Sequence, residues 1–406
     1  MPYTGPEPAR RPLSSDDITD GIVSTADLAD SAVTTAKITN NAVTAAKVSS
    51  DVSQLGKNLI INGAMTVAAR GTQTGQGDTG AYTAVDRYVW RVEGSTQGRV
   101  TTSQDTDVPS GKDFGFSLKV DCTTAESAVA ADEAIVLQQR IEAQNLQHLR
   151  YGDASAKTVM VSFWVKSPKN GTHCVGLYSQ DGNRHYVKEY TVGAADTWEY
   201  KTVTFPGDAS GTINNDTGRG LDISWPLVAG GNHQVTADTW ASGEDWATSN
   251  QQNLLDNTAN NFYITGVQLE VGSVATDFEH EDISITQFKC DRFYQRYDFP
   301  TNGKHIGIGW CNAVRESKWI KWLRAPMRSE NGKSISVSAV GHFSHYDWDG
   351  STGGIGLNDT VAIQDQHQQQ VTLLFRHSGG GSYTVGEGME QRTTTNNAWM
   401  AFEDEL

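Results

Sequence analysis

A ladder of aliphatic residues near the N-terminus constrains what this part of the chain can fold into. Within it, AVTTAKI at residues 32–38 recurs as AVTAAKV at residues 42–48. A five-residue step places successive side chains about 140° apart around an α-helix and on opposite faces of a β-strand. The heptad of a coiled coil does not fit the spacing either. The ladder consists of Ile18, Val23, Leu28, Val33, Ile38, Val43 and Val48.

A repeat as short as this one cannot bury its single apolar residue alone. Other copies of the same chain, wound around one axis, would provide the missing partners. We therefore predict that residues 17–57 form a thin repeat shaft of intertwined chains, with a homotrimer as the favoured assembly. A disordered linker is the alternative, because the stretch is small, polar and free of aromatic residues. The regular spacing favours the shaft.

Charge and hydropathy exclude several classes of partner. The chain carries 32 Lys and Arg against 48 Asp and Glu, a formal net charge of −16. This balance disfavours nucleic acid, which requires clustered positive charge, and suits the surface of a soluble particle. No apolar run approaches the ~20 residues that cross a bilayer, so no membrane insertion is expected. The N-terminus lacks the apolar core of a secretory signal, and we expect synthesis and assembly in a cytoplasm.

The first 16 residues form a segment of their own. They hold four of the ten prolines together with Arg10 and Arg11, and proline stiffens a chain toward an extended form. We interpret residues 1–16 as a peptide that becomes ordered by docking on a larger, acidic partner. A free tail is the alternative, and the residues do not separate the two.

Cysteine usage indicates neither a disulfide framework nor a metal centre. Cys122, Cys174, Cys290 and Cys311 are widely spaced and form no C-x-x-C pair. Zinc sites and redox pairs need such close spacing. We expect free, partly buried thiols.

The body of the chain is predicted to be almost entirely β. Residues 158–166 alternate apolar and polar side chains, as a half-buried strand does. Residues 173–192 contain two such runs around Asp181-Gly182-Asn183, which predicts a hairpin. Further strands are expected at 197–208 and 261–272, with a long loop at 239–258. Many short strands with turn signals predict a β-sandwich over residues 58–281.

A second, smaller β domain is predicted to follow. In residues 282–299 the spacing of Ile285, Phe288, Phe293 and Tyr297 is compatible with one amphipathic helix, and Asp282 is a suitable N-cap. The β pattern then resumes from residue 305 to the end. We therefore predict a linking helix and a distal β domain over residues 282–406.

Two loops are candidates for sugar binding, because sugars are held by aromatic faces and by polar groups at their hydroxyls. The first contains Tyr346, Asp347, Trp348 and Asp349. The second is the 239–258 loop with Trp240 and Trp246. Capping of the sandwich core is the alternative for both, and it is favoured for the second loop.

Metal binding and catalysis are weaker interpretations. Asp347 and Asp349 could contribute oxygens to Ca²⁺, but the acidic positions of a full calcium loop are missing, so a solvated turn is favoured. His342 and His345 are three residues apart, which places them on opposite faces of a strand. Hydrolysis of a polysaccharide would need two carboxyls ~5–9 Å apart, and no pair stands out in the sequence. We expect neither a cofactor nor a resident metal.

Several segments resemble a domain found in bacteriophage tail fibres, and they occur in that family's order. The resemblance implies a virion fibre: a homotrimer anchored by its N-terminus, with jelly-roll domains similar to carbohydrate-binding modules. It also implies binding of host cell-surface glycan during adsorption. The alternatives are a head-decorating or purely architectural fibre, and a polysaccharide depolymerase. The segments are residues 58–72, 82–92, 162–168, 197–208, 264–281 and 290–297.

Overall fold

The computed structural model describes residues 56–313, 315–347, 356–358, 360–376 and 388–406, together with Asp27, Ala29 and Thr34. The chain divides into two units, Met1–Ser53 and Gln54–Leu406, and the description below concerns the second. The predicted docking peptide, with Arg10 and Arg11, and the aliphatic ladder lie outside the described residues, so both stay predictions.

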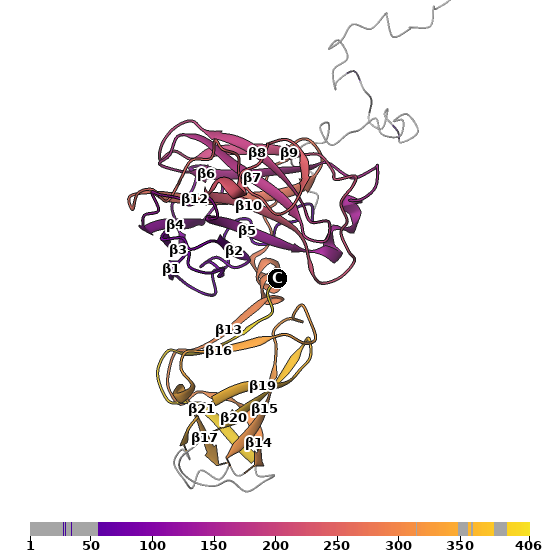
Figure 1. Ribbon diagram of the computed structural model, residues 1–406. Coiled ribbons are helices and arrows are strands. Elements are labelled where there is room, and N and C mark those ends of the chain that lie inside the picture. Colours follow the sequence, from indigo (N-terminus) through magenta and orange to yellow (C-terminus); the bar gives the residue numbers. More distant parts are fainter. Residues whose placement is uncertain are drawn as a thin grey trace, which may run out of the picture. The chain divides into compact units, whose positions relative to one another are not determined.

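The prediction of a mainly β fold with a sandwich and a C-terminal β domain is confirmed (Figure 1). Two six-stranded antiparallel sheets form the sandwich. The first, called sheet A, has the order β1-β3-β4-β12-β6-β9. Its strands are β1 (Gln73–Gln76), β3 (Arg99–Asp105), β4 (Ser117–Thr124), β12 (Asn261–Val271), β6 (Val159–Lys166) and β9 (Glu199–Phe205).

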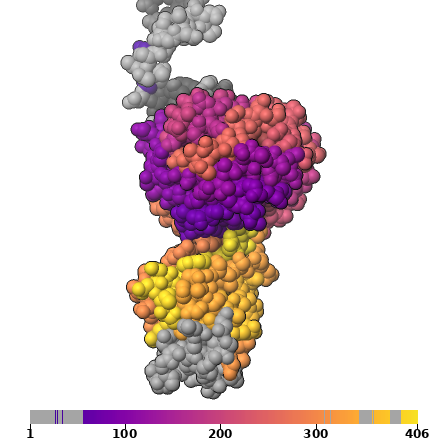
Figure 2. Space-filling model, turned by 60° about the vertical axis from the view of Figure 1, so that its left-hand side comes forward, coloured from indigo at the N-terminus to yellow at the C-terminus, as the bar shows by residue number. Residues whose placement is uncertain are grey.

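The second sheet, called sheet B, has the order β11-β8-β7-β10-β5-β2. Two 3₁₀ helices, η5 (Ala143–Leu149) and η6 (Gly231–His233), flank its strands. Figure 2 shows early (indigo) and late (orange) parts of the sandwich side by side on one face. The strands of sheet B are β11 (Trp240–Ser242), β8 (Arg184–Val192), β7 (Gly171–Ser179), β10 (Arg219–Ala229), β5 (Ala134–Glu142) and β2 (Tyr88–Glu93).

The sandwich core lies between the two sheets and follows the predicted alternation. On β6, Val161, Phe163 and Val165 are fully buried. The Phe163 ring meets Trp225 of sheet B edge-on, with ring centroids 5.7 Å apart. The predicted hairpin is also confirmed, because β7 and β8 pair up to Ser179 opposite Arg184. In this region, alternating apolar and polar residues together with turn residues were therefore sufficient to predict the strands and the hairpin.

The predicted linking helix is right only in its first half. The helix α1 (Ile283–Asp291) begins after Asp282, whose side chain accepts a hydrogen bond from the Ser284 N–H at 2.8 Å, so the predicted N-cap is confirmed. The prediction that the helix continues to residue 299 is wrong, because β13 (Tyr294–Phe299) is a strand.

The apolar residues of this region do not share a helical face. Ile285 and Phe288 are about half exposed, whereas Phe293 and Tyr294 are buried. Residues 294–299 instead form a continuous antiparallel ladder with β22 (Ala398–Glu403). Pairing with a strand about a hundred residues away thus decides the structure here, and local spacing cannot reveal it.

The C-terminal β domain contains two sheets around its own core. A three-stranded sheet has the order β13-β22-β16, and a seven-stranded sheet has the order β18-β17-β21-β14-β15-β20-β19. Trp319, Phe343, Phe375 and Phe402 belong to one buried cluster. The remaining elements are β14 (His305–Ala313), β15 (Glu316–Trp322), β16 (Ser334–Val337), η7 (Val340–His342), β17 (Phe343–Asp347), β18 (Gly356–Leu357), β19 (Thr360–Gln366), β20 (Gln370–Arg376) and β21 (Gly388–Thr393).

The last residues return from the C-terminal domain to the sandwich, and Figure 1 marks this end beside α1. Arg70 contacts the carboxylates of Glu403 at 2.9 Å and Glu405 at 3.1 Å. Arg87, which is 1% exposed, also pairs with Glu405. Arg140 donates to the main-chain oxygen of Leu406 at 2.5 Å. We call residues 403–406 with these arginines the C-terminal clasp.

Two further sequence expectations can be compared with the fold. Cys122, Cys174 and Cys290 are buried free thiols, and Cys311 is buried as well. Among the described residues, no helix is both long and apolar enough to span a membrane. The predicted domain boundaries at residues 57/58 and 281/282 stay predictions.

Candidate functional site

The outer face of sheet A carries a row of aromatic and charged side chains. Phe262 and Ile264 of β12 are buried in the core, so Tyr263 between them points to the opposite, outer face. Tyr263 lies directly opposite Lys119 of β4 and Lys166 of β6. Side chains opposite each other on adjacent strands lie about 5 Å apart. Lys119, Tyr263 and Lys166 therefore form one row across three strands.

Trp198, just before β9, extends this row. The Lys166 Nζ lies 4.3 Å from the Tyr263 ring centroid and 5.7 Å from that of Trp198. The two rings are 6.2 Å apart at 65°. Asp107 accepts a hydrogen bond from the Trp198 indole N–H at 2.9 Å and also pairs with Lys166. A cation and a carboxylate thus hold the two rings in a fixed arrangement.

A second aromatic pair lies on the same face. Trp164 of β6 pairs with Tyr200 of β9, and their ring centroids are 5.3 Å apart. Tyr200 is 44% exposed, and the Lys112 Nζ lies 5.6 Å from the Trp164 ring centroid. Trp164 is also a diagonal neighbour of Tyr263, since it faces Thr265 of the same strand. We call Trp164, Trp198, Tyr200 and Tyr263, with Lys119 and Lys166, the aromatic platform.

The ionisation of the platform fits a role in hydrogen bonding. Partial burial, followed by the nearby carboxylates of Asp105 and Asp107, raises the pKa of Tyr263 to about 12. Partial burial alone would raise the pKa of Asp107, but hydrogen bonds from Lys166 and Trp198 outweigh it and lower that pKa. At neutral pH the platform and the neighbouring Asp107 therefore offer a neutral phenol, an ionised carboxylate and two lysines beside partly exposed aromatic rings.

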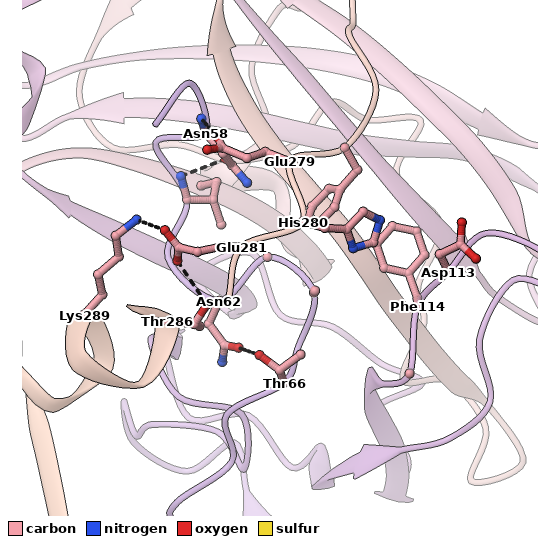
Figure 3. Close-up of a pocket in the computed structure, with 15 residues that line it drawn as sticks. Asn58, Asn62, Thr66, Asp113, Phe114, Glu279, His280, Glu281, Thr286 and Lys289 are labelled. Carbon is pink, nitrogen blue, oxygen red and sulfur yellow. Dashed lines mark hydrogen bonds and ion pairs between the residues drawn. The ribbon is translucent and has the colours of Figure 1, made fainter. Parts of the chain in front are cut away.

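A small pocket lies next to this platform (Figure 3). Its volume is about 100 Å³. Phe114, Phe278 and His280 form its aromatic wall, with ring centroids 5.0–5.4 Å apart. Phe114 also reaches the platform, because a Cβ placed on Gly266 would lie 2.6 Å from Phe114 and 3.1 Å from Trp164. The aromatic surface is therefore continuous from the platform to the pocket.

Two of the carboxylates that line the pocket, those of Glu279 and Glu281, have structural partners. Glu279 accepts hydrogen bonds from the main-chain N–H groups of Gly56 and Asn58, the latter at 2.8 Å. Glu281 accepts a hydrogen bond from the Thr286 hydroxyl at 3.0 Å and pairs with Lys289, as Figure 3 shows. These two groups fasten the start of the sandwich and the helix α1.

The predicted loop at 239–258 places its two tryptophans against the sandwich. Trp246 is 2% exposed and packs with Val136, Cys174 and Val187 on the outer face of sheet B. Its ring offers no face to a ligand in this conformation. Trp240 is partly buried, meets Tyr186 edge-on at 5.3 Å, and donates its indole N–H to Pro206. This packing corresponds to the capping alternative.

The predicted tip site is only partly within the described residues. Tyr346 and Asp347 lie on β17, in register with Glu390 and Met389 of β21. Trp348 and Asp349 lie outside the described residues, so this sugar or Ca²⁺ site stays a prediction. The His342 ring is within hydrogen-bond distance of the Ser338 hydroxyl, at 2.8 Å. The described part of the chain contains no cluster of three side chains able to hold a metal.

Sequence reasoning missed the platform, although its signal was present. The strands at 197–208 and 261–272 were predicted; Trp198 and Tyr200 stand at alternate positions of the first, and Tyr263 stands between the buried Phe262 and Ile264 of the second. Alternation shows that these side chains share the outer faces of their strands. It does not show that β12 and β6 are neighbours, and this pairing brings the aromatics together.

Comparisons with known proteins give only distant similarities. No family model matches the chain, and no curated protein matches it. The enzymatically active domain of tailspike protein 4 from bacteriophage CBA120 is similar over 53% of this chain and 22% of its own, with 13% identity and a TM-score of 0.28.

Sugar-binding proteins are among the other similar structures. A putative sugar-binding protein from Bacteroides thetaiotaomicron matches 53% of this chain and 100% of its own, with 12% identity and a TM-score of 0.30. The family 11 carbohydrate-binding module of a Clostridium thermocellum cellulase matches 52% and 98%, with 16% identity and a TM-score of 0.25.

Proposed function

We propose that this chain is a structural fibre protein of a bacteriophage virion, a tail fibre, that binds host cell-surface glycan during adsorption. The aromatic platform is the observation that carries the glycan-binding part. Sugars pack their C–H surfaces on aromatic faces and bond their hydroxyls to charged or polar groups. Trp198 and Tyr263 provide the ring faces, and Lys119, Lys166 and Asp107 provide the polar contacts.

The fibre part of the proposal is supported by the sequence. The aliphatic ladder over residues 17–57 favours an intertwined homotrimer, and the segments quoted above resemble phage tail fibre domains. Residues 1–16 would dock on another virion protein, so the protein would reside in the virion after assembly in the host cytoplasm. Three shallow platforms on one trimer would raise the effective affinity by multivalency.

The platform is tested by titrating the full-length protein with host surface polysaccharide in a calorimeter. We expect Trp198→Ala and Tyr263→Ala each to weaken binding roughly ten-fold, the effect of losing about 1.4 kcal/mol of contact energy. Trp322→Ala is the matched control, because Trp322 is 67% exposed on the C-terminal domain. Equal affinities for all four proteins would exclude the platform as the binding face.

Two further measurements separate the alternatives. The soluble protein should bind host cells and block phage adsorption; failure of both would favour a head-decorating or purely architectural fibre. New reducing ends should not accumulate when the protein is incubated with the polysaccharide. Sustained release of oligosaccharide would favour the depolymerase instead.

A further inference from the structure

A second cavity shares two lining residues, Lys289 and Asn58, with the small pocket of Figure 3. Its volume is about 500 Å³, and it is open to solvent. The end of strand β5, the helix η5, the segment 56–61, the end of α1 with the residues that follow it, and Arg87 line it. This volume is within the range of small-ligand sites, and the proposed aromatic platform makes no use of it.

Basic side chains gather at the cavity, although the chain as a whole is acidic. Arg87, Arg140, Lys289 and Arg292 line it, together with the imidazole of His148. Glu142 is the one acidic residue among the described residues that line the cavity. Arg292 donates a hydrogen bond to each of the two carboxylate oxygens of Glu142, at 2.7 and 2.8 Å. Arg87 pairs with Glu405, Lys289 with Glu281, and Arg140 donates to the main-chain oxygen of Leu406; none of these three partners is among the residues lining the cavity.

Two guanidinium groups of this cavity have N–H donors without a partner. The Nε atoms of Arg87 and Arg140 are buried and have no hydrogen-bond acceptor among the described residues. Arg87 is only 1% exposed, and its ring contact with Phe293, 3.5 Å to the centroid, fixes it in place. A buried donor without an acceptor costs free energy, and an anionic group that reached these Nε atoms would remove that cost.

We propose that this cavity binds the carboxylate of an acidic sugar residue, a uronic acid, within the glycan. The inference rests on the proposed glycan binding and adds the class of sugar. Planar guanidinium groups match the two oxygens of a carboxylate, and Lys289 adds a compact charge from the helix. The amide of Asn145 and the ring of His148, both exposed and among the lining residues, are suited to bonding sugar hydroxyls.

The test is calorimetric titration of the full-length protein with two oligosaccharides of equal length, one containing glucuronic acid and one neutral. We expect the acidic one to bind roughly ten-fold more tightly or better, because hydrogen bonds to charged groups are the stronger ones. Lys289→Gln and Arg140→Gln should each reduce this preference. Arg376→Gln, which removes the same charge from an exposed site on the C-terminal domain, should not.

The outcomes separate this inference from the proposed function. Neutral binding that depends on Trp198, without any acidic preference, would overturn the cavity assignment and leave the platform standing. Binding of glucuronate that depends on Lys289, without neutral binding, would support the cavity and count against the platform. Inorganic phosphate that binds as tightly as the acidic oligosaccharide would show recognition of charge alone and overturn the sugar assignment.

Discussion

Gly266 shows how one residue fixes the aromatic surface. It lies at a bulge of β12 with φ +61°, and a Cβ there would lie 2.6 Å from Phe114. The positive φ and the close contact with Phe114 both disfavour a residue with a side chain at this position. We predict that Gly266→Ala lowers the free energy of unfolding by about 1–2 kcal/mol and weakens glycan binding, because Phe114 and Trp164 must shift.

Urea unfolding and tryptophan fluorescence measure this effect. Gly231→Ala is the control, since Gly231 has no atom within 4 Å of its added Cβ. It should change the stability by less than about 0.5 kcal/mol. Equal stabilities for the two variants would contradict the role given to Gly266.

Asp86 predicts a pH dependence. Burial, opposed by Arg70 and reinforced by Glu405, raises its pKa from 3.8 to about 6. A carboxyl whose pKa is raised on folding favours the folded state while it is protonated, and this contribution falls as the pH rises through the window between about 4 and 6. Asp86→Asn, which mimics the protonated form, should therefore gain stability relative to the wild type as the pH rises from 4 to 7.

Chemical unfolding at several pH values measures this difference between the two proteins. The difference in the free energy of unfolding between Asp86→Asn and the wild type should change by about 1–3 kcal/mol across this pH range. A constant difference would mean that Asp86 does not change its protonation there.

At the level of elements, alternation of side chains made most of the sandwich predictable. Strand β6, the β7–β8 hairpin and β12 were all expected from period-two patterns. Residues 294–299 were not, because their partner β22 is distant in the sequence. The aromatic platform was missed for the same reason: its four aromatic residues were on predicted strands, but which strands are neighbours is a property of the fold.

The N-cap of α1 gives a prediction for one element. The side-chain and main-chain donors of Ser284 lower the pKa of Asp282. A carboxylate with a lowered pKa stabilises the folded state above its unfolded pKa, and the contribution is lost as the pH falls through the folded pKa. Asp282→Ala should lower the melting temperature at pH 7, and Asp282→Ser should restore most of it, because serine also caps helices.

Thermal unfolding followed by circular dichroism tests this, with Asp298→Ala as the control. Asp298 is an exposed aspartate on the neighbouring strand β13 and pairs only with Arg296 among the described residues. The decrease in melting temperature caused by Asp282→Ala should disappear at a pH low enough to protonate the Asp282 carboxylate. A decrease that is the same at every pH would argue against capping by the carboxylate.

The proposed assembly of the whole molecule would depend on the aliphatic ladder. If residues 17–57 intertwine, Val33→Asp or Ile38→Asp brings a buried charge from every chain to the common axis, which is costly. Both should weaken the proposed trimer. Thr34→Asp adds the same charge at an exposed neighbouring position and should leave it intact. Light scattering of the purified proteins measures the mass, and unchanged trimers for all three would count against the shaft.

The C-terminal clasp has a mechanical consequence. From the sandwich the chain runs through α1 into β13. Strand β22 pairs with β13 and leads back to residues 403–406, which contact the sandwich. A pull on the C-terminal domain is therefore shared between a covalent joint and an ionic one that lie next to each other. Breaking these ion pairs would leave the two domains joined by the covalent link alone. They could then rotate relative to one another while both hydrophobic cores stayed folded.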